Sequence, residues 1–259
     1  MNRLLLFSLT LFYAAVSMAD LLDFAIPEAK SGYEFLSQEM RDIQDDDFLN
    51  PGMQAVDAGR EHYLDRGDED NGCADCHGEE GEKLAPASLA AYPKFDAHYN
   101  RLMTLQDRIH ACWTDRLDRF PMMYDEKKLV ELETFIRHLA QGQTIAVKQD
   151  EAATEWFELG KSLYNKRFGQ MGMTCQHCHV IYQGRFMRGN RLTQGQSNGF
   201  PVYRFKSDKV TSLHKRFDEC FVQLRATPYE KGSREYKALE YYMAILSNGL
   251  KVETPGVRF

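Results

Sequence analysis

Cys73-Ala74-Asp75-Cys76-His77 and Cys175-Gln176-His177-Cys178-His179 are two copies of the pattern C-x-x-C-H in a chain of 259 residues. This pattern is the attachment signal of a c-type haem, because two thiols separated by two residues can reach the two vinyl groups of one porphyrin. The histidine that follows then lies beneath the iron as its proximal ligand. The sequence therefore predicts two covalently bound haem c groups, attached through Cys73, Cys76, Cys175 and Cys178, with His77 and His179 as iron ligands.

Other uses of these cysteines fit the spacing less well. A redox-active C-x-x-C pair does not need the histidine that follows each pair here. A four-cysteine zinc site would have to join pairs that begin at Cys73 and Cys175, which is far beyond the spacing of zinc ribbons. His177 lies between the two attachment cysteines, and we expect it to contact the surface or a haem propionate rather than the iron.

The surroundings of the two motifs repeat each other. Helical patterns at 54–65 and 153–167 precede the motifs, with a glycine in each (Gly59 and Gly160). Amphipathic helices at 126–141 and 233–248 follow them, contain Leu-Glu, and end at Gly142 and Gly249, as helices often do. We expect Leu129, Leu132, Phe135, Ile136 and Leu139 to pack the first of these helices onto its core. The pattern predicts a mostly α protein of two tandem class I cytochrome c-like domains related by an internal repeat.

The N-terminus reads as a targeting segment. Arg3, an apolar run over 4–16 and small residues before Asp20 are typical of a cleaved secretory signal peptide. That run is shorter than the roughly 20 residues of a membrane-spanning helix, and no other apolar stretch approaches that length. We expect a signal peptide at 1–19, domains at 20–145 and 153–259 joined by a polar linker near 144–152, export to the periplasm and no membrane span.

Charge divides the chain into an acidic and a basic half. Residues 20–149 carry 27 acidic and 14 basic side chains, whereas residues 150–259 carry 11 and 17. No strongly basic domain exists, which argues against a nucleic-acid partner, and the basic half suits a small anion. Two differently solvated surfaces would give the same asymmetry.

Cys112 and Cys220 remain after haem attachment, at comparable positions of the two repeats. Each falls where cytochrome c domains supply the sixth iron ligand, and a thiolate there would favour ferric iron and a low potential. Two alternatives stay open from spacing alone. The two cysteines can form one disulfide in an oxidising compartment. Methionines can be the ligands instead: Met122 or Met123 for the first haem and Met187 or Met243 for the second.

The C-terminal third resembles the SoxA family, the dihaem subunits of the periplasmic sulfur-oxidising SoxAX complex. The resemblance rests on Leu213-His214-Lys215-Arg216-Phe217-Asp218-Glu219-Cys220, Arg225-Ala226-Thr227-Pro228-Tyr229 and Glu253-Thr254-Pro255-Gly256-Val257-Arg258. It is dense over about 160–259 and looser over about 35–139. It implies L-cysteine S-thiosulfotransferase activity: thiosulfate is joined oxidatively to a cysteine of the carrier SoxYZ, and two electrons pass through haem to the monohaem partner SoxX and a small cytochrome c.

The resemblance also implies residue roles. Cys220 matches the second-haem ligand and active-site cysteine, often found as a persulfide; Arg216 matches a substrate-binding arginine, and Cys112 matches the first-haem ligand. Some relatives keep a disulfide in place of the first haem, but this chain has Cys73, Cys76 and His77.

The residues are consistent with this chemistry. A guanidinium such as that of Arg216 matches the oxygens of a sulfonate, and Lys215 adds charge nearby. A propionate salt bridge is the other interpretation of Arg216. Arg108, four residues before Cys112, is interpreted as an echo of the repeat, and the first haem as a relay or relic. A dihaem electron carrier and a thiosulfate dehydrogenase that forms tetrathionate remain the alternative functions.

Overall fold

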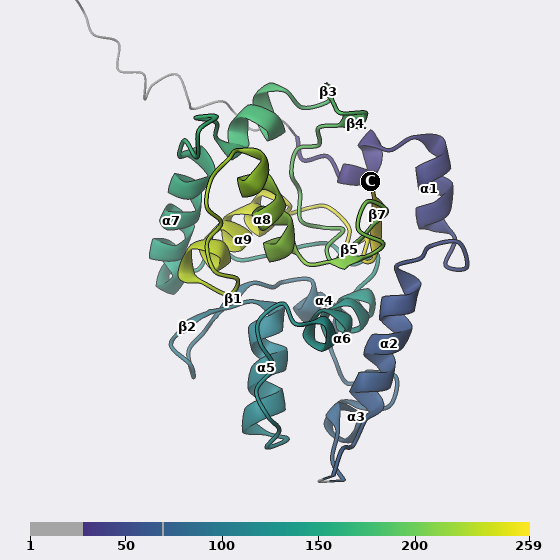
Figure 1. Cartoon of the computed structure of the whole chain (residues 1–259). Helices are drawn as coiled ribbons and strands as arrows, with labels where there is room; N and C mark the ends of the chain where they lie inside the picture. The colour runs from purple at the N-terminus through teal and green to yellow at the C-terminus, as the bar shows by residue number, and fades with distance from the viewer. Residues whose placement is uncertain (1–27, 69) are drawn as a thin grey trace, which may run out of the picture.

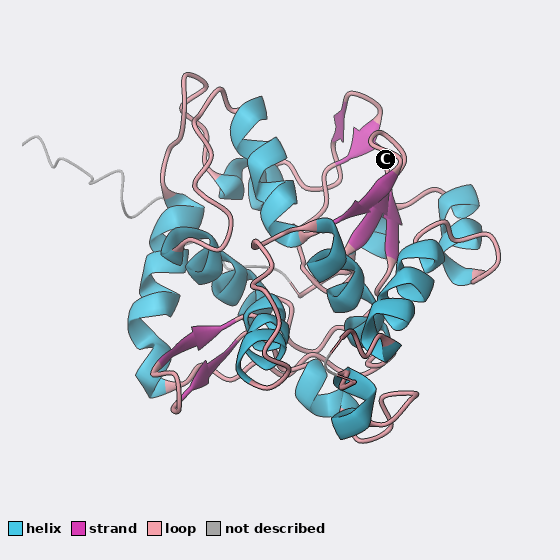
Figure 2. Ribbon diagram, turned by 60° about the horizontal axis from the view of Figure 1, so that its bottom comes forward, coloured by secondary structure: helices cyan, strands magenta, loops and turns pink. Residues whose placement is uncertain are grey.

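The computed structural model describes residues 28–68 and 70–259. The predicted signal peptide lies outside the described residues. Within them the chain is mostly helical, with small sheets of two or three strands (Figures 1 and 2). No helix in the described part is long and apolar enough to cross a membrane.

The predicted internal repeat is confirmed by the order of the elements. The first repeat contains α2 (Met53–Leu64), α3 (Cys73–His77), α4 (Pro86–Leu89), β1 (Lys94–Asp96), β2 (Arg101–Met103), α5 (Leu105–Asp115) and α6 (Lys127–His138). The second contains α7 (Thr154–Asn165), a π-helical turn (His177–Ile181), β3 (Phe186–Met187), β4 (Asn190–Arg191), β5 (Val202–Arg204), β6 (Lys209–Thr211), α8 (Leu213–Gln223) and α9 (Arg234–Leu246). The remaining elements are α1 (Gln38–Asp45), β7 (Gly256–Arg258) and 3₁₀ turns at Gly32–Phe35 and Glu151–Ala153.

The first and last helices of each repeat cross at a glycine. A Cβ on Gly59 of α2 would lie 2.1 Å from the carbonyl oxygen of Glu131 in α6. A Cβ on Gly160 of α7 would lie 2.1 Å from the carbonyl oxygen of Ala238 in α9. Both crossings therefore bring backbone against backbone, which only glycine permits. The two glycines that the sequence pattern singled out thus have the same structural role.

The apolar face of each terminal helix forms the core of its repeat. On α6, Leu129, Leu132, Phe135 and Ile136 are buried and Leu139 packs against them, as predicted. The core of the first repeat also takes in Tyr241 and Ala244 of α9. The two repeats therefore share apolar contacts.

Two segments cross the predicted domain boundaries. Helix α1 packs on β7, which pairs in parallel with β5 of the second repeat (Figure 1). The linker predicted as polar contains Ile145 and Val147, whose side chains are buried, and the Ile145 N–H donates to the carbonyl of Leu250 at 2.8 Å. The division at 20–145 and 153–259 stays a prediction, with this segment packed between the repeats.

Two candidate haem sites and the Cys220 centre

The first C-x-x-C-H motif forms the short helix α3, in which residues three apart lie on one face. Asp75 holds its start, because its carboxylate accepts from the Gly72 N–H at 2.7 Å and from Arg66 at 2.7 Å. Cys73 is half-buried and Cys76 is exposed. No disulfide joins any of the six cysteines, all of which lie in the described residues, so the alternative disulfide between Cys112 and Cys220 is not formed.

A cavity of about 250 Å³ opens beside this motif. Cys73 and His77 line one part of it, Cys112 of α5 lines another, and most of the remaining wall is apolar, including Leu89 and Ile136. Burial lowers the pKa of His77, which favours the neutral imidazole that binds iron. An apolar cavity lined by an attachment thiol, a histidine and a further thiol fits a c-type haem.

The methionine alternatives lie away from this cavity. Met122 is buried in the core of the first repeat, and Met123 is 76% exposed. Neither belongs to the described residues that line the cavity, whereas Cys112 does. In the second repeat, Met243 is buried in α9 and Met187 lies on the exposed strand β3. The geometry favours a thiolate over a methionine at the first site.

The second motif holds His179 in one orientation. Its Nδ1 donates to the carbonyl of Thr193 at 2.9 Å, which leaves Nε2 with the lone pair that binds a metal. Gly195, at φ +76°, packs on the ring, and a Cβ there would lie 2.9 Å from His179 Cγ. His177 is tied locally, since its Nδ1 accepts from the Thr174 N–H at 3.1 Å. The donor set thus fits a second haem through His179.

Helix α8 brings Arg216 and Cys220 onto one face, one turn apart. It begins at Ser212, whose hydroxyl accepts from the Lys215 N–H at 3.1 Å. Cys220 is the largest influence that raises the pKa of Arg216. The pKa of Cys175 is raised to about 12, mainly by burial and next by Cys220. The Cys220 sulfur therefore lies near both the second attachment motif and Arg216.

Two residues of this centre were missed by the sequence analysis. Arg216 Nη1 donates to Glu219 Oε2 at 2.8 Å, and Arg204 Nη2 of β5 lies 3.6 Å from the same oxygen. The signal that would have found Arg204 is the repeat itself. Arg204 lies 108 residues after Asp96, just as Arg216 lies 108 after Arg108. Lys215, by contrast, is half-buried and its side chain makes no described hydrogen bond or ion pair.

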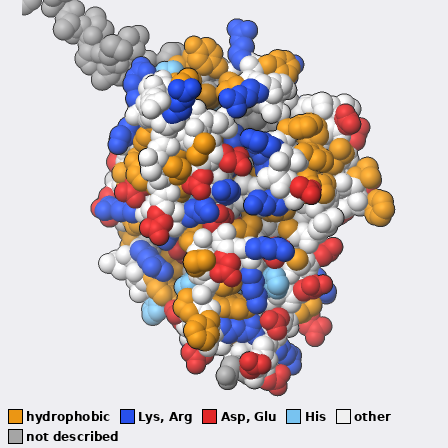
Figure 3. Space-filling view, in the orientation of Figure 1, with side chains coloured by type: hydrophobic (Ala, Val, Ile, Leu, Met, Phe, Trp, Pro, Cys, Tyr) orange, Lys and Arg blue, Asp and Glu red, His pale blue; other side chains and the backbone are white. Residues whose placement is uncertain are grey.

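In the first repeat the corresponding arginine, Arg108, has other partners. Arg108 of α5 forms an ion pair with Asp96 of β1 and donates to the Tyr92 hydroxyl at 3.3 Å. The surface follows the same division: Asp and Glu side chains prevail at the lower end of the view, in the first repeat, and Lys and Arg at the upper end (Figure 3). The first site therefore resembles the second in scaffold and differs in charge.

Comparison with known proteins agrees with this architecture. The family model described as SoxA/TsdA, cytochrome c domain, matches residues 58–145 and again 159–252. The L-cysteine S-thiosulfotransferase subunit SoxA of Pseudaminobacter salicylatoxidans is 36% identical over 89% of this chain and 81% of its own length. The SoxA subunit of Paracoccus pantotrophus is 36% identical over 88% of this chain and 78% of its own.

A solved structure supports the same assignment. The crystal structure of SoxXA from P. pantotrophus matches with a TM-score of 0.83 and 35% identity, over 89% of this chain and 87% of that chain. The tandem cytochrome c-like fold predicted from the sequence is confirmed, and cytochrome c domains bind haem c. The chain belongs to the SoxA family of c-type cytochromes.

Proposed function

We propose that this chain is a periplasmic L-cysteine S-thiosulfotransferase that joins thiosulfate to a cysteine of the carrier SoxYZ. It carries two haem c groups and works with the monohaem subunit SoxX, which passes electrons to a small cytochrome c. The observation that carries the proposal is the placement of Arg216 one turn before Cys220 on α8, beside the second attachment motif. The relatives that bear this activity in their names are similar over nearly the whole chain.

Arg216 is proposed to bind the substrate. Thiosulfate is a dianion, and the planar guanidinium offers two donors to the sulfonate oxygens. Binding in this way would direct the outer, sulfane sulfur of thiosulfate along α8 toward Cys220.

The bond-forming step oxidises two sulfur atoms. When bound, the haem supplies a one-electron oxidant next to Cys220. The Cys220 thiolate and the sulfane sulfur of thiosulfate form a sulfur–sulfur bond, and two electrons leave, one after the other, toward SoxX. The carrier thiolate then attacks the sulfane sulfur and releases the Cys220 thiolate. The product is a cysteine S-thiosulfonate on the carrier, and Cys220 returns to its starting state.

The iron ligands follow from the same geometry. His77 and Cys112 are proposed for the first haem, and His179 and Cys220 for the second. Arg108 is already paired with Asp96, and the first haem is proposed to relay electrons or to be a relic.

Thiosulfate-dependent reduction of cytochrome c, with SoxYZ and SoxX supplied, tests the proposal. Cys220→Ala should abolish the rate while both haems stay attached. Cys220→Met is the matched control, because a thioether can still bind iron but cannot form the sulfur–sulfur bond. It should keep a six-coordinate spectrum and remain inactive. A Cys220→Met variant that turns over at the wild-type rate would show that Cys220 is a ligand only and that the chain is an electron carrier.

One alternative has an observation in its favour, since the matching family model covers TsdA as well as SoxA. A thiosulfate dehydrogenase joins two thiosulfate ions into tetrathionate and releases two electrons. Omitting SoxYZ separates the two functions. The proposed enzyme should then stop after one turnover, whereas a dehydrogenase would continue and accumulate tetrathionate.

A further inference from the structure

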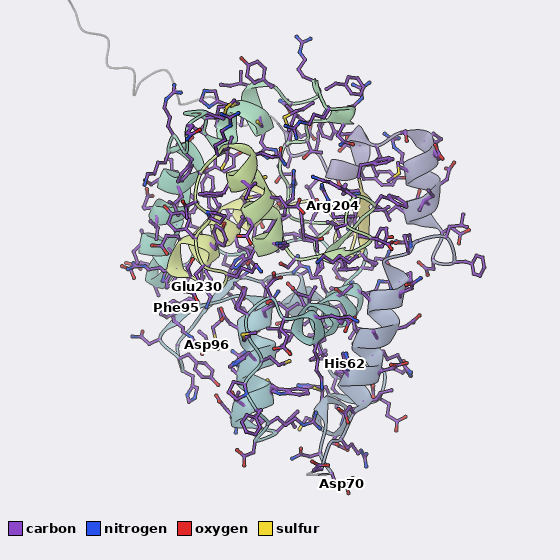
Figure 4. All side chains as sticks on the ribbon, in the orientation of Figure 1. His62, Asp70, Phe95, Asp96, Arg204 and Glu230 are labelled. Carbon is purple, nitrogen blue, oxygen red and sulfur yellow. The ribbon has the colours of Figure 1, made fainter. Side chains whose placement is uncertain are left out.

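Asp96 and Arg204 occupy the same position in the two repeats. Each ends the first strand of an antiparallel pair, where Asp96 pairs with Arg101 and Arg204 pairs with Lys209. Each is 12 residues ahead of the arginine of the following helix, Arg108 or Arg216. Figure 4 labels both Asp96 and Arg204. The first repeat therefore has the carboxylate of Asp96 at the position where the second repeat has the guanidinium of Arg204.

Arg204 lacks a full set of partners. Its side chain is only 13% exposed, and Nη2 lies 3.6 Å from Glu219 Oε2, too far for a strong hydrogen bond. The Nε is buried and has no hydrogen-bond partner among the described residues. Arg216 takes the same Glu219 oxygen at 2.8 Å. One carboxylate thus faces two guanidinium groups, and a net positive charge remains beside Cys220.

The neighbouring strand shows that this is not a general property of the sheet. Arg258 is the register partner of Arg204 in β7. Its Nη1 donates to Gln44 Oε1 at 2.6 Å and to the Val257 carbonyl at 2.7 Å. A buried donor without a partner destabilises a fold, so such groups often mark a ligand site.

The surroundings of Arg204 place it at the Cys220 centre. Burial and then Arg216 lower the pKa of Arg204, while Glu219 and Cys220 raise it. Arg204 Nη2 lies 3.6 Å from the carboxylate of Glu219, which is the partner of Arg216 and the residue next to Cys220, so Arg204 belongs to the same site.

We propose that Arg204 is a second sulfonate-binding residue of the Cys220 centre, which receives thiosulfate together with Arg216. The inference rests on the proposed function and specifies how its substrate is held. The sulfonate competes with Glu219 for the two guanidinium groups. Its oxygens accept hydrogen bonds from the N–H groups of Arg204 that have no partner. Two arginines against one carboxylate suit a dianion, whereas a single arginine paired with Glu219 would be neutral.

Calorimetric titration of the holoprotein with thiosulfate, without carrier or electron acceptor, tests this directly. Arg204→Gln should raise the Kd about tenfold, as loss of one charge-assisted contact does. Arg204→Asp repeats the side chain of the first repeat and should remove measurable binding. Lys209→Gln is the matched control, because Lys209 is the exposed strand partner of Arg204, and its Kd should stay within about twofold. Arg204→Lys, which keeps a charge, should lie between wild type and Arg204→Gln.

Glu219→Gln distinguishes direct binding from a positioning role. If Arg204 binds the sulfonate, removing the competing carboxylate should tighten thiosulfate binding. If Arg204 only holds Glu219, and through it Arg216, the same variant should weaken binding, and the proposal fails.

Two further results would overturn the inference. Unchanged affinity in a folded Arg204→Gln variant would show that Arg204 makes no contact with thiosulfate. A shift in the haem absorption spectrum and reduction potential of that variant would show that Arg204 holds a haem propionate instead. If the wild-type protein neither binds thiosulfate nor transfers it, the proposed function itself is wrong, independently of Arg204.

Discussion

In the first repeat Arg108 is paired with Asp96, whereas in the second repeat Arg216 shares the carboxylate of Glu219 with Arg204. Both arrangements are built on corresponding elements of the two repeats: an antiparallel strand pair, and a helix whose arginine lies one turn before a cysteine. The repeats differ here in the charge of the side chain that ends the strand and in Glu219, whose counterpart in the first repeat is Ala111. The scaffold of the repeat and its chemistry can therefore vary separately.

The repeats also differ at the polar contact between them. Gln106 in the first repeat accepts from the Asp125 N–H at 2.9 Å and donates to Glu133 at 2.7 Å. His214 occupies the same position in the second: its Nδ1 accepts from the Gly232 N–H at 3.1 Å and its Nε2 lies 3.0 Å from Glu240. An uncharged amide is replaced by a titratable ring in otherwise matching surroundings. The second repeat should consequently respond to acid where the first does not.

The glycine crossings should give the largest effects. Gly59→Ala and Gly160→Ala each drive a Cβ to 2.1 Å from a backbone carbonyl, so each should destabilise the protein by about 3 kcal/mol or more. Urea unfolding and haem content measure this. Gly142→Ala is the control, because its Cβ meets nothing within 4 Å and only the strain of φ +76° remains, about 1 kcal/mol. If only one crossing proves sensitive, the two repeats do not share their helix packing.

His214→Gln should protect the protein against acid. Burial lowers the pKa of His214 to about 3, well below the ordinary value of 6.5. Between these values the unfolded chain binds the proton and the folded protein does not, so the free energy of unfolding falls as the pH drops through this range. The variant should narrow the stability difference between pH 7 and pH 4 by about 2–3 kcal/mol.

The reciprocal variant Gln106→His sharpens the same comparison. It should add an acid-dependent loss to the first repeat, which wild type lacks. Equal acid sensitivity in wild type, His214→Gln and Gln106→His would show that the His214 imidazole does not cause the loss of stability in acid.

Glu133 and Glu240 should act at the opposite end of the pH scale. They line one cavity of about 30 Å³ between the repeats together with Arg137, whose Nη1 donates to the Leu89 carbonyl. Burial raises the pKa of each carboxyl to about 8. The folded protein then holds protons that the unfolded chain releases, so the free energy of unfolding falls as the pH rises from about 4.5 to 8.

Glu240→Gln removes part of this dependence. We expect the loss of stability between pH 6 and pH 9 to shrink by about 1–2 kcal/mol, a smaller effect because the two carboxyls interact and share their protons. Denaturant unfolding at both pH values measures it, with Glu235→Gln, on the first turn of the same helix, as a control for net charge. An unchanged dependence in Glu240→Gln would show that Glu240 is already ionised in the folded protein.

Local pattern was sufficient for the helices and the repeat, and it is also the basis on which the attachment cysteines are predicted. Gly59 and Gly160 were identifiable because a glycine inside an amphipathic helix needs a packing reason, and Cys112 and Cys220 because they lie at comparable distances from the terminal helices. These features depend on spacing along the chain, which a sequence displays directly.

Glu219 and α1 could not be found in this way. Arg204 lies at the same 108-residue offset from Asp96 as Arg216 does from Arg108, but the change from an acidic to a basic side chain at that position gains a meaning only once the strand pairing is known. Helix α1 packs on β7 at the far end of the chain, and Ile145 and Val147 of the linker are buried by chain from the second repeat. Contacts of this kind are decided by tertiary packing, for which periodicity gives no signal.

The smallest expected difference concerns the caps of the terminal helices. Helix α9 begins after Ser233, whose hydroxyl accepts from the Tyr236 N–H at 3.3 Å, whereas α6 begins after Glu126, which makes no side-chain cap bond. Ser233→Ala should therefore destabilise the protein by about 1 kcal/mol, because it leaves an N–H at the start of α9 without its partner. Glu126→Ala removes no such bond and should destabilise the protein by only about 0.3 kcal/mol. Thermal unfolding of both variants measures the gap. Equal effects would mean that the two terminal helices start alike, and that the repeats differ only at the buried polar positions.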